Sequence, residues 1–278
     1  MPFTLSHVAA VVPAYRPLAR AHLFSAAVIG SMAPDFGVLL PESLARWQTH
    51  SVQALVSFCL PGGLLGWWLT QSLVKPATLE VLPDGAWARA RAQHPPLLPA
   101  SAHTWVRVAG GILLGAATHL VWDAFTHEDA GGVRMLAVLD DYGPGFAGHS
   151  LRLFAWLQYG SSLLGLAVVI LALASWLRHA PAPVPAPPRR LARPERIAWI
   201  CAYALLPLLA LAWSVARQYA AGHPPWMSVW AIGRDATAFL RGATLALLAV
   251  SLALRLRLGA IRGAGGGTGA RAPRRSPA

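Results

Sequence analysis

The chain has 278 residues, of which 55% are hydrophobic and only 12% are charged. A soluble domain carries roughly 25% charged residues, so this composition and a mean hydropathy of +0.48 exclude an ordinary soluble fold. The formal net charge of +12 would suit a nucleic-acid partner. The basic residues are, however, scattered over loops and a tail without interleaved aromatic residues, so we exclude nucleic-acid binding and predict an integral membrane protein.

Six apolar stretches follow one another along the chain, and each approaches the ~20 residues that a helix needs to cross ~30 Å of hydrocarbon. Because lipid offers no hydrogen bonds to the backbone, each stretch must be helical. The first is the weakest, since Pro34 and Asp35 interrupt it. The predicted fold class is therefore all-α, a polytopic membrane helix bundle with about six transmembrane helices. The stretches are residues 22–40, 52–74, 106–125, 153–177, 197–216 and 236–254.

The predicted domain organisation is a single integral membrane domain over residues 1–258. Within it, a Pro-rich linker over residues 180–196 joins the fourth and fifth helices, and its run APAPVPAPP favours a stiff polyproline-type chain. Residues 259–278 are rich in Gly and Arg, which predicts a disordered basic tail.

The Lys and Arg residues divide unequally between the two sides of such a bundle, with 17 of the 23 on one side and six on the other. Cytoplasmic loops carry the excess of positive charge in membrane proteins. The pattern predicts a multi-pass protein of the cell membrane with a cytoplasmic C-terminus. In a simple six-helix topology both termini are cytoplasmic.

The third stretch carries the most informative polar residues. Its segment 118–127 (THLVWDAFTH) spaces His119, Asp123 and His127 four residues apart, which places them on one face of a helix. Ionisable groups at this depth are costly and usually face a site or an aqueous cavity. We therefore predict that this stripe is functional.

Two further polar residues converge on the same membrane face, Asp35 at the outer end of the first stretch and His50 at the outer start of the second. Imidazole and carboxylate ligands together suit a divalent metal ion, zinc first, with manganese and iron as alternatives. A metal would offset the cost of burying Asp123, keep His119 neutral as a ligand and activate water. Simpler roles stay open for single residues: interfacial or capping side chains for His50 and His127, and a turn residue for Asp35.

Five motifs stand out along the chain: residues 1–7 (MPFTLSH), 28–36 (VIGSMAPDF), 49–51 (THS), 118–127 (THLVWDAFTH) and 157–162 (LQYGSS). Together they resemble a bacterial integral membrane family known only as a domain of unknown function. The resemblance spans roughly residues 1–260. That family is in turn distantly similar to membrane-bound metal-dependent hydrolases and to zinc-dependent phospholipase C.

The remote hydrolases share an N-terminal His, a Pro-Asp at a helix end, a His-Ser pair and a His-x-x-x-Asp helix. The resemblance implies a metal-dependent hydrolase that acts on a lipid or other phospho-ester near the outer headgroups. Those hydrolases often carry a second acidic residue after Pro-Asp, where this chain has Phe36 and Gly37, so a full two-metal site is in doubt. The ligands implied are His7, Asp35, His50, His119 and Asp123, and the helix-three stripe adds His127.

His7 conflicts with the simple topology, because a cytoplasmic N-terminus could not reach a site at the outer face. One resolution is a re-entrant segment over residues 4–15 that dips in from the outer side, with residues 16–20 at its base. The other is that His7 is not a ligand.

Two other functions remain open beside the hydrolase. In a transporter or a proton- or cation-binding membrane protein, the same residues would bind the ion or relay protons. In a non-catalytic membrane assembly protein, the site would have lost its activity. In every case membrane lipids are partners.

Overall fold

The computed structural model describes residues 4–40, 46–92, 101–145, 150–181, 191–222 and 229–266. In these ranges all regular structure is helical, apart from one isolated antiparallel bridge between Tyr142 and Arg152. The all-α prediction is confirmed. The helices long and apolar enough to cross a membrane are Val52–Val81, Ala102–Thr126, Leu153–His179, Arg193–Ala220 and Gly233–Ala260, and a shorter apolar helix spans Phe24–Leu39.

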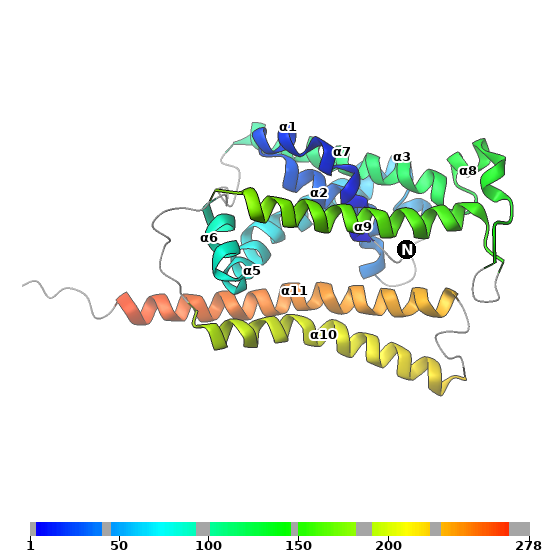
Figure 1. The fold of residues 1–278 in the computed structure, drawn as a ribbon. Helices are drawn as coiled ribbons and strands as arrows, with labels where there is room; N and C mark the ends of the chain where they lie inside the picture. The colour runs from blue at the N-terminus through cyan, green and yellow to red at the C-terminus, as the bar shows by residue number, and fades with distance from the viewer. Residues whose placement is uncertain are drawn as a thin grey trace, which may run out of the picture.

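The N-terminal region forms a hairpin instead of a single span. Figure 1 shows that the chain begins at the end of the bundle where α7 finishes, turns at the opposite end beside α1 and returns through α2. His22 makes the turn in the left-handed backbone region, with φ of 56°. This path departs from a first stretch that crosses as one helix. That residues 4–15 are re-entrant in the membrane stays a prediction. The hairpin comprises η1 (Thr4–Ala10), η2 (Val12–Ala14), α1 (Tyr15–Arg20), α2 (Phe24–Met32) and η3 (Ala33–Leu39).

The second span, Val52–Val81, is one continuous helix that widens twice into π-helical turns, η5 (Leu55–Cys59) and η6 (Thr70–Val74). Each π turn directly precedes an α segment with a proline in its first turn, Pro61 or Pro76. Proline lacks an N–H and its ring clashes with the preceding turn, and a π turn accommodates that clash. The α segments of this span are α3 (Val52–Ala54), α4 (Leu60–Leu69) and α5 (Lys75–Val81), and η4 (Arg46–Gln48) precedes it.

The remaining elements alternate between long spans and short connecting helices. They are α6 (Asp84–Ala92), α7 (Ala102–Thr126), α8 (Gly131–Met135), η7 (Ala137–Asp140), α9 (Leu153–His179), α10 (Arg193–Ala220) and α11 (Val229–Gly266).

Two helix boundaries differ from the predicted segment limits. Helix α10 begins at Arg193, inside the predicted linker 180–196, because a proline occupies its first turn and the Glu195 carboxylate accepts a hydrogen bond from the backbone N–H of Ala192 at 3.2 Å. Residues 182–190 of that linker lie outside the described residues. Helix α11 continues to Gly266, past the predicted start of the tail at residue 259.

Helices α2 and α7 pack with their backbones in contact. A Cβ atom added at Gly30 would collide with the backbone carbonyl of Ile112, and one added at Gly115 would collide with that of Ala27. Gly111 and Gly115 form a small-xxx-small pattern on α7, which permits such close approach between membrane helices. The contact holds the end of α2 against the polar stripe of α7.

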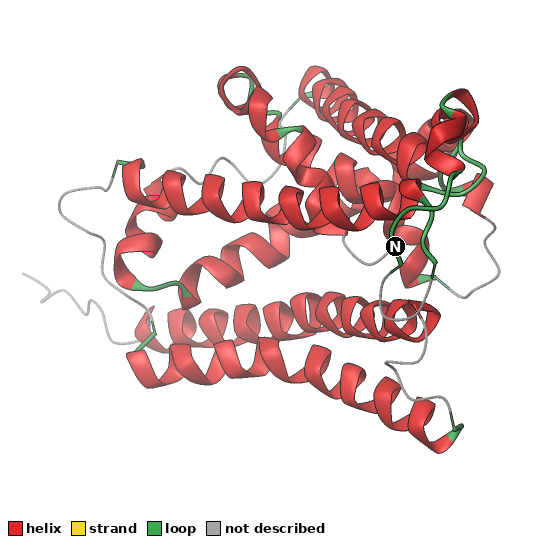
Figure 2. Cartoon of the chain, turned by 45° about the vertical axis from the view of Figure 1, so that its right-hand side comes forward, coloured by secondary structure: helices red, strands yellow, loops and turns green. Residues whose placement is uncertain are grey.

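Helices α10 and α11 form an antiparallel pair along one side of the bundle (Figures 1 and 2). One end of this pair packs on α5 through the buried side chains of Ala77, Leu254 and Leu258. Nearer the start of α11, the Arg241 guanidinium donates hydrogen bonds to the backbone carbonyls of Val38 (2.7 Å) and Leu40 (3.3 Å). Arg241 thereby ties the pair to the end of η3.

Candidate metal centre

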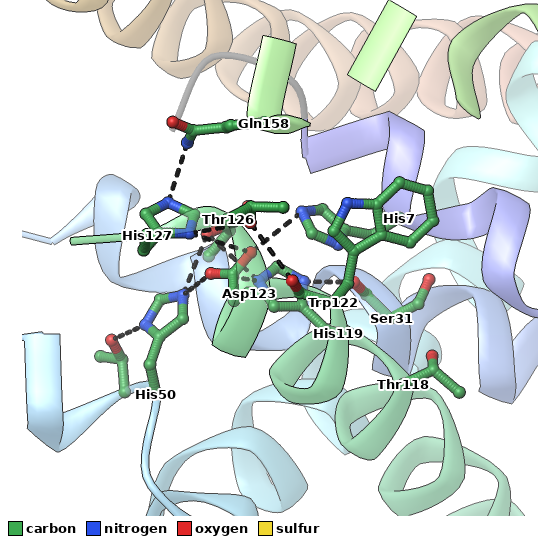
Figure 3. A network of polar contacts seen from close by, with 12 residues as sticks. His7, Ser31, His50, Thr118, His119, Trp122, Asp123, Thr126, His127 and Gln158 are labelled. Carbon is green, nitrogen blue, oxygen red and sulfur yellow. Dashed lines mark hydrogen bonds and ion pairs between the residues drawn. The ribbon is translucent and has the colours of Figure 1, made fainter. Parts of the chain in front are cut away.

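The polar stripe of α7 points into the bundle. His119 is fully buried and Asp123 is 3% exposed, as their four-residue spacing requires if both face the same side. His127 follows the last helical residue with extended backbone (φ −129°, ψ 144°). Figure 3 shows the three side chains together with His7 and His50 around one centre.

His119 has a fixed orientation and a fixed proton position. Its Nδ1 lies 2.7 Å from the backbone carbonyl of Ser31, and because a carbonyl only accepts, Nδ1 must donate. In the neutral ring Nε2 then carries the lone pair. This buried atom makes no hydrogen bond within the described chain, and it lies 3.5 Å from Oδ2 of Asp123 and 3.7 Å from Oδ1 of Asp35.

Asp35 owes its place to the proline before it. Helix α2 ends at Met32, and Pro34 in the first turn of η3 begins a tighter 3-10 helix with Asp35 in the same turn. The carboxylate is 3% exposed. Its Oδ1 lies 3.3 Å from Nε2 of His50, while its buried Oδ2 has no hydrogen-bond partner among the residues that the structure describes.

Each residue of the THS motif contributes to holding His50. The Ser51 hydroxyl caps α3 by accepting the N–H of Ala54 at 3.1 Å. The Thr49 hydroxyl contacts Nδ1 of His50 at 2.6 Å, and the Cys59 thiol donates to the Thr49 carbonyl at 3.5 Å. The imidazole therefore presents Nε2 to the centre, 3.6 Å from Oδ2 of Asp123.

Four donor atoms thus form a closed ring around the centre, which we call the four-donor ring. Its atoms, in order, are His50 Nε2, Asp35 Oδ1, His119 Nε2 and Asp123 Oδ2, and successive separations are 3.3, 3.7, 3.5 and 3.6 Å. Ligand atoms that lie ~2.1 Å from a tetrahedral zinc ion are about 3.4 Å from one another. Successive donors around the ring therefore have the spacing of neighbouring atoms in such a ligand shell.

The second oxygen of Asp123 faces two other histidines. Oδ1 lies 3.6 Å from Nε2 of His7 and 3.4 Å from Nδ1 of His127. The ring of His7 stacks on that of His119 with centroids 3.7 Å apart and an interplanar angle of 19°. On the far side of His127, Gln158 Nε2 donates to Nε2 at 2.9 Å (Figure 3).

All six predicted site residues lie in this one cluster. The ligand atoms of His7, His119 and Asp123 lie within 4.8 Å of one another, and so do those of Asp35, His50 and His119. The structure places four of the six in the four-donor ring, with His7 and His127 against the other oxygen of Asp123. That any of them binds a metal stays a prediction.

Sequence reasoning missed the residues that position the cluster. Ser31 fixes His119, Thr49 fixes His50, and Gln158 bonds His127. All three lie within the motifs quoted for the family resemblance, which was the available signal. Their partners could not be assigned because each bond except that of Thr49 joins elements far apart in the sequence.

The fold and the cluster define a class, a multi-pass α-helical membrane protein with a buried His and Asp centre near one end of the bundle. The chain belongs to the family described as Domain of unknown function (DUF4184), whose model matches residues 1–252. No curated protein and no solved structure gives a significant match. The distant similarity to metal-dependent hydrolases therefore stays a hypothesis.

Proposed function

We propose that the four-donor ring binds one divalent metal ion and that the protein is a metal-dependent hydrolase of a lipid or phospho-ester. The observation that carries the proposal is the ring itself, two carboxylate and two imidazole donors with successive separations of 3.3–3.7 Å. Zinc fits the nitrogen and oxygen donors best, and manganese or iron would accept the same donors. For hydrolysis the ion would need one further coordination position, beyond the four donors, for water.

Charge supports a cation at this place. The two carboxylates, Asp35 and Asp123, are each 3% exposed, and their neighbours in the ring are imidazoles. With neutral imidazoles the ring carries two negative charges, which are costly to bury unless a cation balances them. A divalent ion would balance both, and it would require neutral histidines and ionised aspartates.

A network of hydrogen bonds without a metal ion fits the separations between the ring atoms less well. Hydrogen bonds between imidazolium and carboxylate are typically ~2.7–2.9 Å long, whereas the ring separations are 3.3–3.7 Å. His119 Nε2 and Asp35 Oδ2 are buried and make no hydrogen bond within the described residues. Such orphaned atoms are expensive, and a bound cation would satisfy His119 directly.

The hydrogen bond of His119 to Ser31 also favours one metal ion over two. Both ligand sets in the cluster use His119, but its Nδ1 is occupied by Ser31, so only Nε2 is left to coordinate. One imidazole nitrogen serves one ion. This agrees with Phe36 and Gly37 standing where related hydrolases carry a further acidic residue.

Hydrolysis requires activated water and a controlled proton, and a divalent ion held by the four-donor ring would supply the first by polarising the water. His127 is placed for the second. It is the most exposed of the site histidines, with a side chain 17% exposed, and it lies at the end of α7 between Asp123 and Gln158. An imidazole at the rim can act as a general acid or base. His119 and Asp123 are buried, so their ring atoms lie away from bulk solvent.

The experiment that tests the hydrolase is an assay of purified protein loaded with zinc, manganese or iron. Phospholipid vesicles and a soluble phosphodiester serve as substrates, and released headgroup or product is measured. We expect activity that a chelator removes and that Asp123→Asn lacks, with Asp235→Asn as the matched control. Metal-loaded wild-type protein that cleaves neither substrate class would exclude this function while leaving metal binding intact.

A second candidate function is cation transport, which the broken N-terminal hairpin favours. Transporter sites often lie where discontinuous helices meet, and Phe24–Leu39 is a short apolar helix that changes from α to 3-10 at Ala33, beside the cluster. Proteoliposomes loaded with a zinc-sensitive dye separate the two functions. Zinc influx without hydrolysis would select transport, and metal retention with neither activity would select a non-catalytic assembly protein.

We infer from the loop charges that the cluster lies toward the outer face and that the C-terminus is cytoplasmic. A cytoplasm-active reporter fused after Ala86, beside the basic end of α6, should be active. The same reporter fused after Asp129, just beyond α7, should be silent. A silent fusion at Ala86 and an active one at Asp129 would show that the bundle has the opposite orientation in the membrane.

A further inference from the structure

A groove runs along α7 directly beside the candidate metal centre. Its cavity volume is about 550 Å³. Helix α7 lines one wall from Leu114 to Thr126, α9 contributes Leu157 and Ser161, and η1 contributes Ala10. No charged side chain of the described residues lines it.

Two side chains that line this groove also contact residues of the candidate metal centre. Trp122 lines the groove and sets its ring edge-on to that of His7, with centroids 5.4 Å apart, and its indole N–H donates to the Ser161 hydroxyl at 3.0 Å. Thr126 lines the groove and contacts Nδ1 of His127 at 3.2 Å. Figure 3 shows Trp122 beside His7 and Thr126 beside His127. A molecule in the groove would therefore have one end next to the cluster.

The groove opens toward the hydrocarbon of the membrane. Its lining residues Val121, Leu114 and Leu157 are 63%, 48% and 42% exposed, and they lie on two membrane-spanning helices. From Leu114 to Thr126 the helix rises about 18 Å at 1.5 Å per residue. One leaflet of the hydrocarbon core is roughly 15 Å thick. The groove thus has the length and the polarity of a single acyl chain.

The depth of the cluster matches the ester groups of a lipid. Helix α7 has 25 residues, so it is about 37 Å long and extends beyond the ~30 Å hydrocarbon core. Asp123 lies within one turn of its end. Trp47, three residues before His50, and Tyr142, in the segment between α7 and α9, are both 67% exposed, and Trp and Tyr concentrate at the membrane interface. The cluster therefore lies near the boundary between acyl chains and headgroups.

We propose that this groove holds one acyl chain of a membrane lipid and so presents the ester or phospho-ester of that lipid to the metal centre. The inference rests on the proposed function and narrows its substrate class from any phospho-ester to an acyl-chain lipid of the surrounding leaflet. Trp122 and Thr126 form the wall between the acyl chain and the reacting group.

Photolabelling tests the groove without depending on activity. The full chain is reconstituted in phosphatidylcholine vesicles that contain a phosphatidylcholine with a diazirine in one acyl chain, and labelled residues are mapped by mass spectrometry after irradiation. We expect labels to concentrate on residues 114–126 of α7 and 153–161 of α9, above the level on lipid-facing residues of α10. Asp123→Asn should keep this pattern, because the groove does not need the metal.

Two tryptophan variants, one inside the groove and one outside it, provide the matched comparison. Ala117→Trp places a large side chain into the groove and should lower labelling of α7 about tenfold. Ala167→Trp makes the same substitution at an exposed position of α9 outside the groove lining and should leave it unchanged. Should Ala117→Trp fail to fold, Leu157→Trp fills the groove from the α9 side.

Even labelling of α7, α9 and α10 in wild-type protein would overturn the inference, and so would unchanged labelling in a folded filled-groove variant. Failure of the proposed function has a different signature. Wild-type protein that binds no metal but labels in the groove would refute the metal centre and leave the lipid site standing. Metal-dependent hydrolysis without preferential labelling would refute the lipid groove alone.

Discussion

Asp123 on α7 and Asp235 on α11 are both buried in membrane-spanning helices, 3% and 8% exposed, yet their surroundings differ in kind. Asp235 Oδ1 accepts a hydrogen bond of 2.6 Å from the Gln218 amide, whose oxygen accepts from Arg234 at 3.1 Å. Asp123 faces four imidazoles at 3.4–3.6 Å. A short bond from an amide is typical of a structural aspartate, whereas a carboxylate among imidazoles at ligand spacing is the arrangement that the proposed cation site requires.

The two helices also differ in how far the protein encloses them. In the most apolar window of α7, 39% of residues are buried, against 28% for α11. At Gly30 and Gly115 the backbones of α2 and α7 lie in direct contact. A site that must keep several ligands within a few tenths of an ångström of their required positions needs such support from neighbouring helices. The enclosed helix carries the cluster, and the helix at the side of the bundle carries a simple interhelical hydrogen bond.

The largest effect on metal binding is expected from substitutions of the two carboxylates in the four-donor ring, Asp123 and Asp35. Asp123→Asn keeps the shape of the side chain but removes the anionic charge that balances a cation, so metal affinity should fall about 100-fold. Asp35→Asn should behave in the same way. Metal content after gel filtration measures the loss, and Asp235→Asn is the matched control that should retain metal. Full metal content in folded Asp123→Asn would make Asp123 a packing residue.

Substitution at the rim of the cluster should have a smaller effect. His127 and His7 contact the second oxygen of Asp123 and lie outside the four-donor ring, so His127→Ala should weaken metal binding about tenfold, the lower end of the effect of ligand-orienting neighbours. Competition with a chromogenic chelator gives the affinity. A loss as large as that of Asp123→Asn would show that His127 is itself a ligand.

The smallest effect on metal binding is expected from a substitution in the α10–α11 pair. Gln218→Leu leaves Asp235 without its amide donor, which should lower the free energy of unfolding by about 1–3 kcal/mol. Metal affinity should not change, since the pair lies apart from the cluster. Thermal unfolding in detergent and metal titration on the same sample provide both values. A parallel loss of metal would show that the two regions are coupled, with Arg241 as the link to η3.

Much of this architecture could be predicted from the sequence because its signals are local. Apolar runs of sufficient length gave the spans, and the four-residue spacing of His119 and Asp123 gave one face of α7. The hairpin at His22 and the π turns before Pro61 and Pro76 depend on backbone details that hydropathy does not record. The first stretch was consequently expected to cross the membrane as one helix.

The candidate site was likewise predictable in part. Its residue types were predictable, since buried imidazoles and carboxylates are rare in membrane helices. Their arrangement was not, because the four-donor ring depends on backbone contact between α2 and α7 and on the Ser31 carbonyl that orients His119. The Gln218 and Asp235 pair escaped notice because its partners lie on different helices and match no motif.

The central claim is tested most directly by elemental analysis of detergent-purified wild-type protein. Protein incubated separately with zinc, manganese and iron, then freed of unbound ion, should retain about one ion per chain with at least one of the three metals. The single free nitrogen of His119 predicts one ion and not two. Folded protein that stays metal-free after incubation with all three metals would contradict the account.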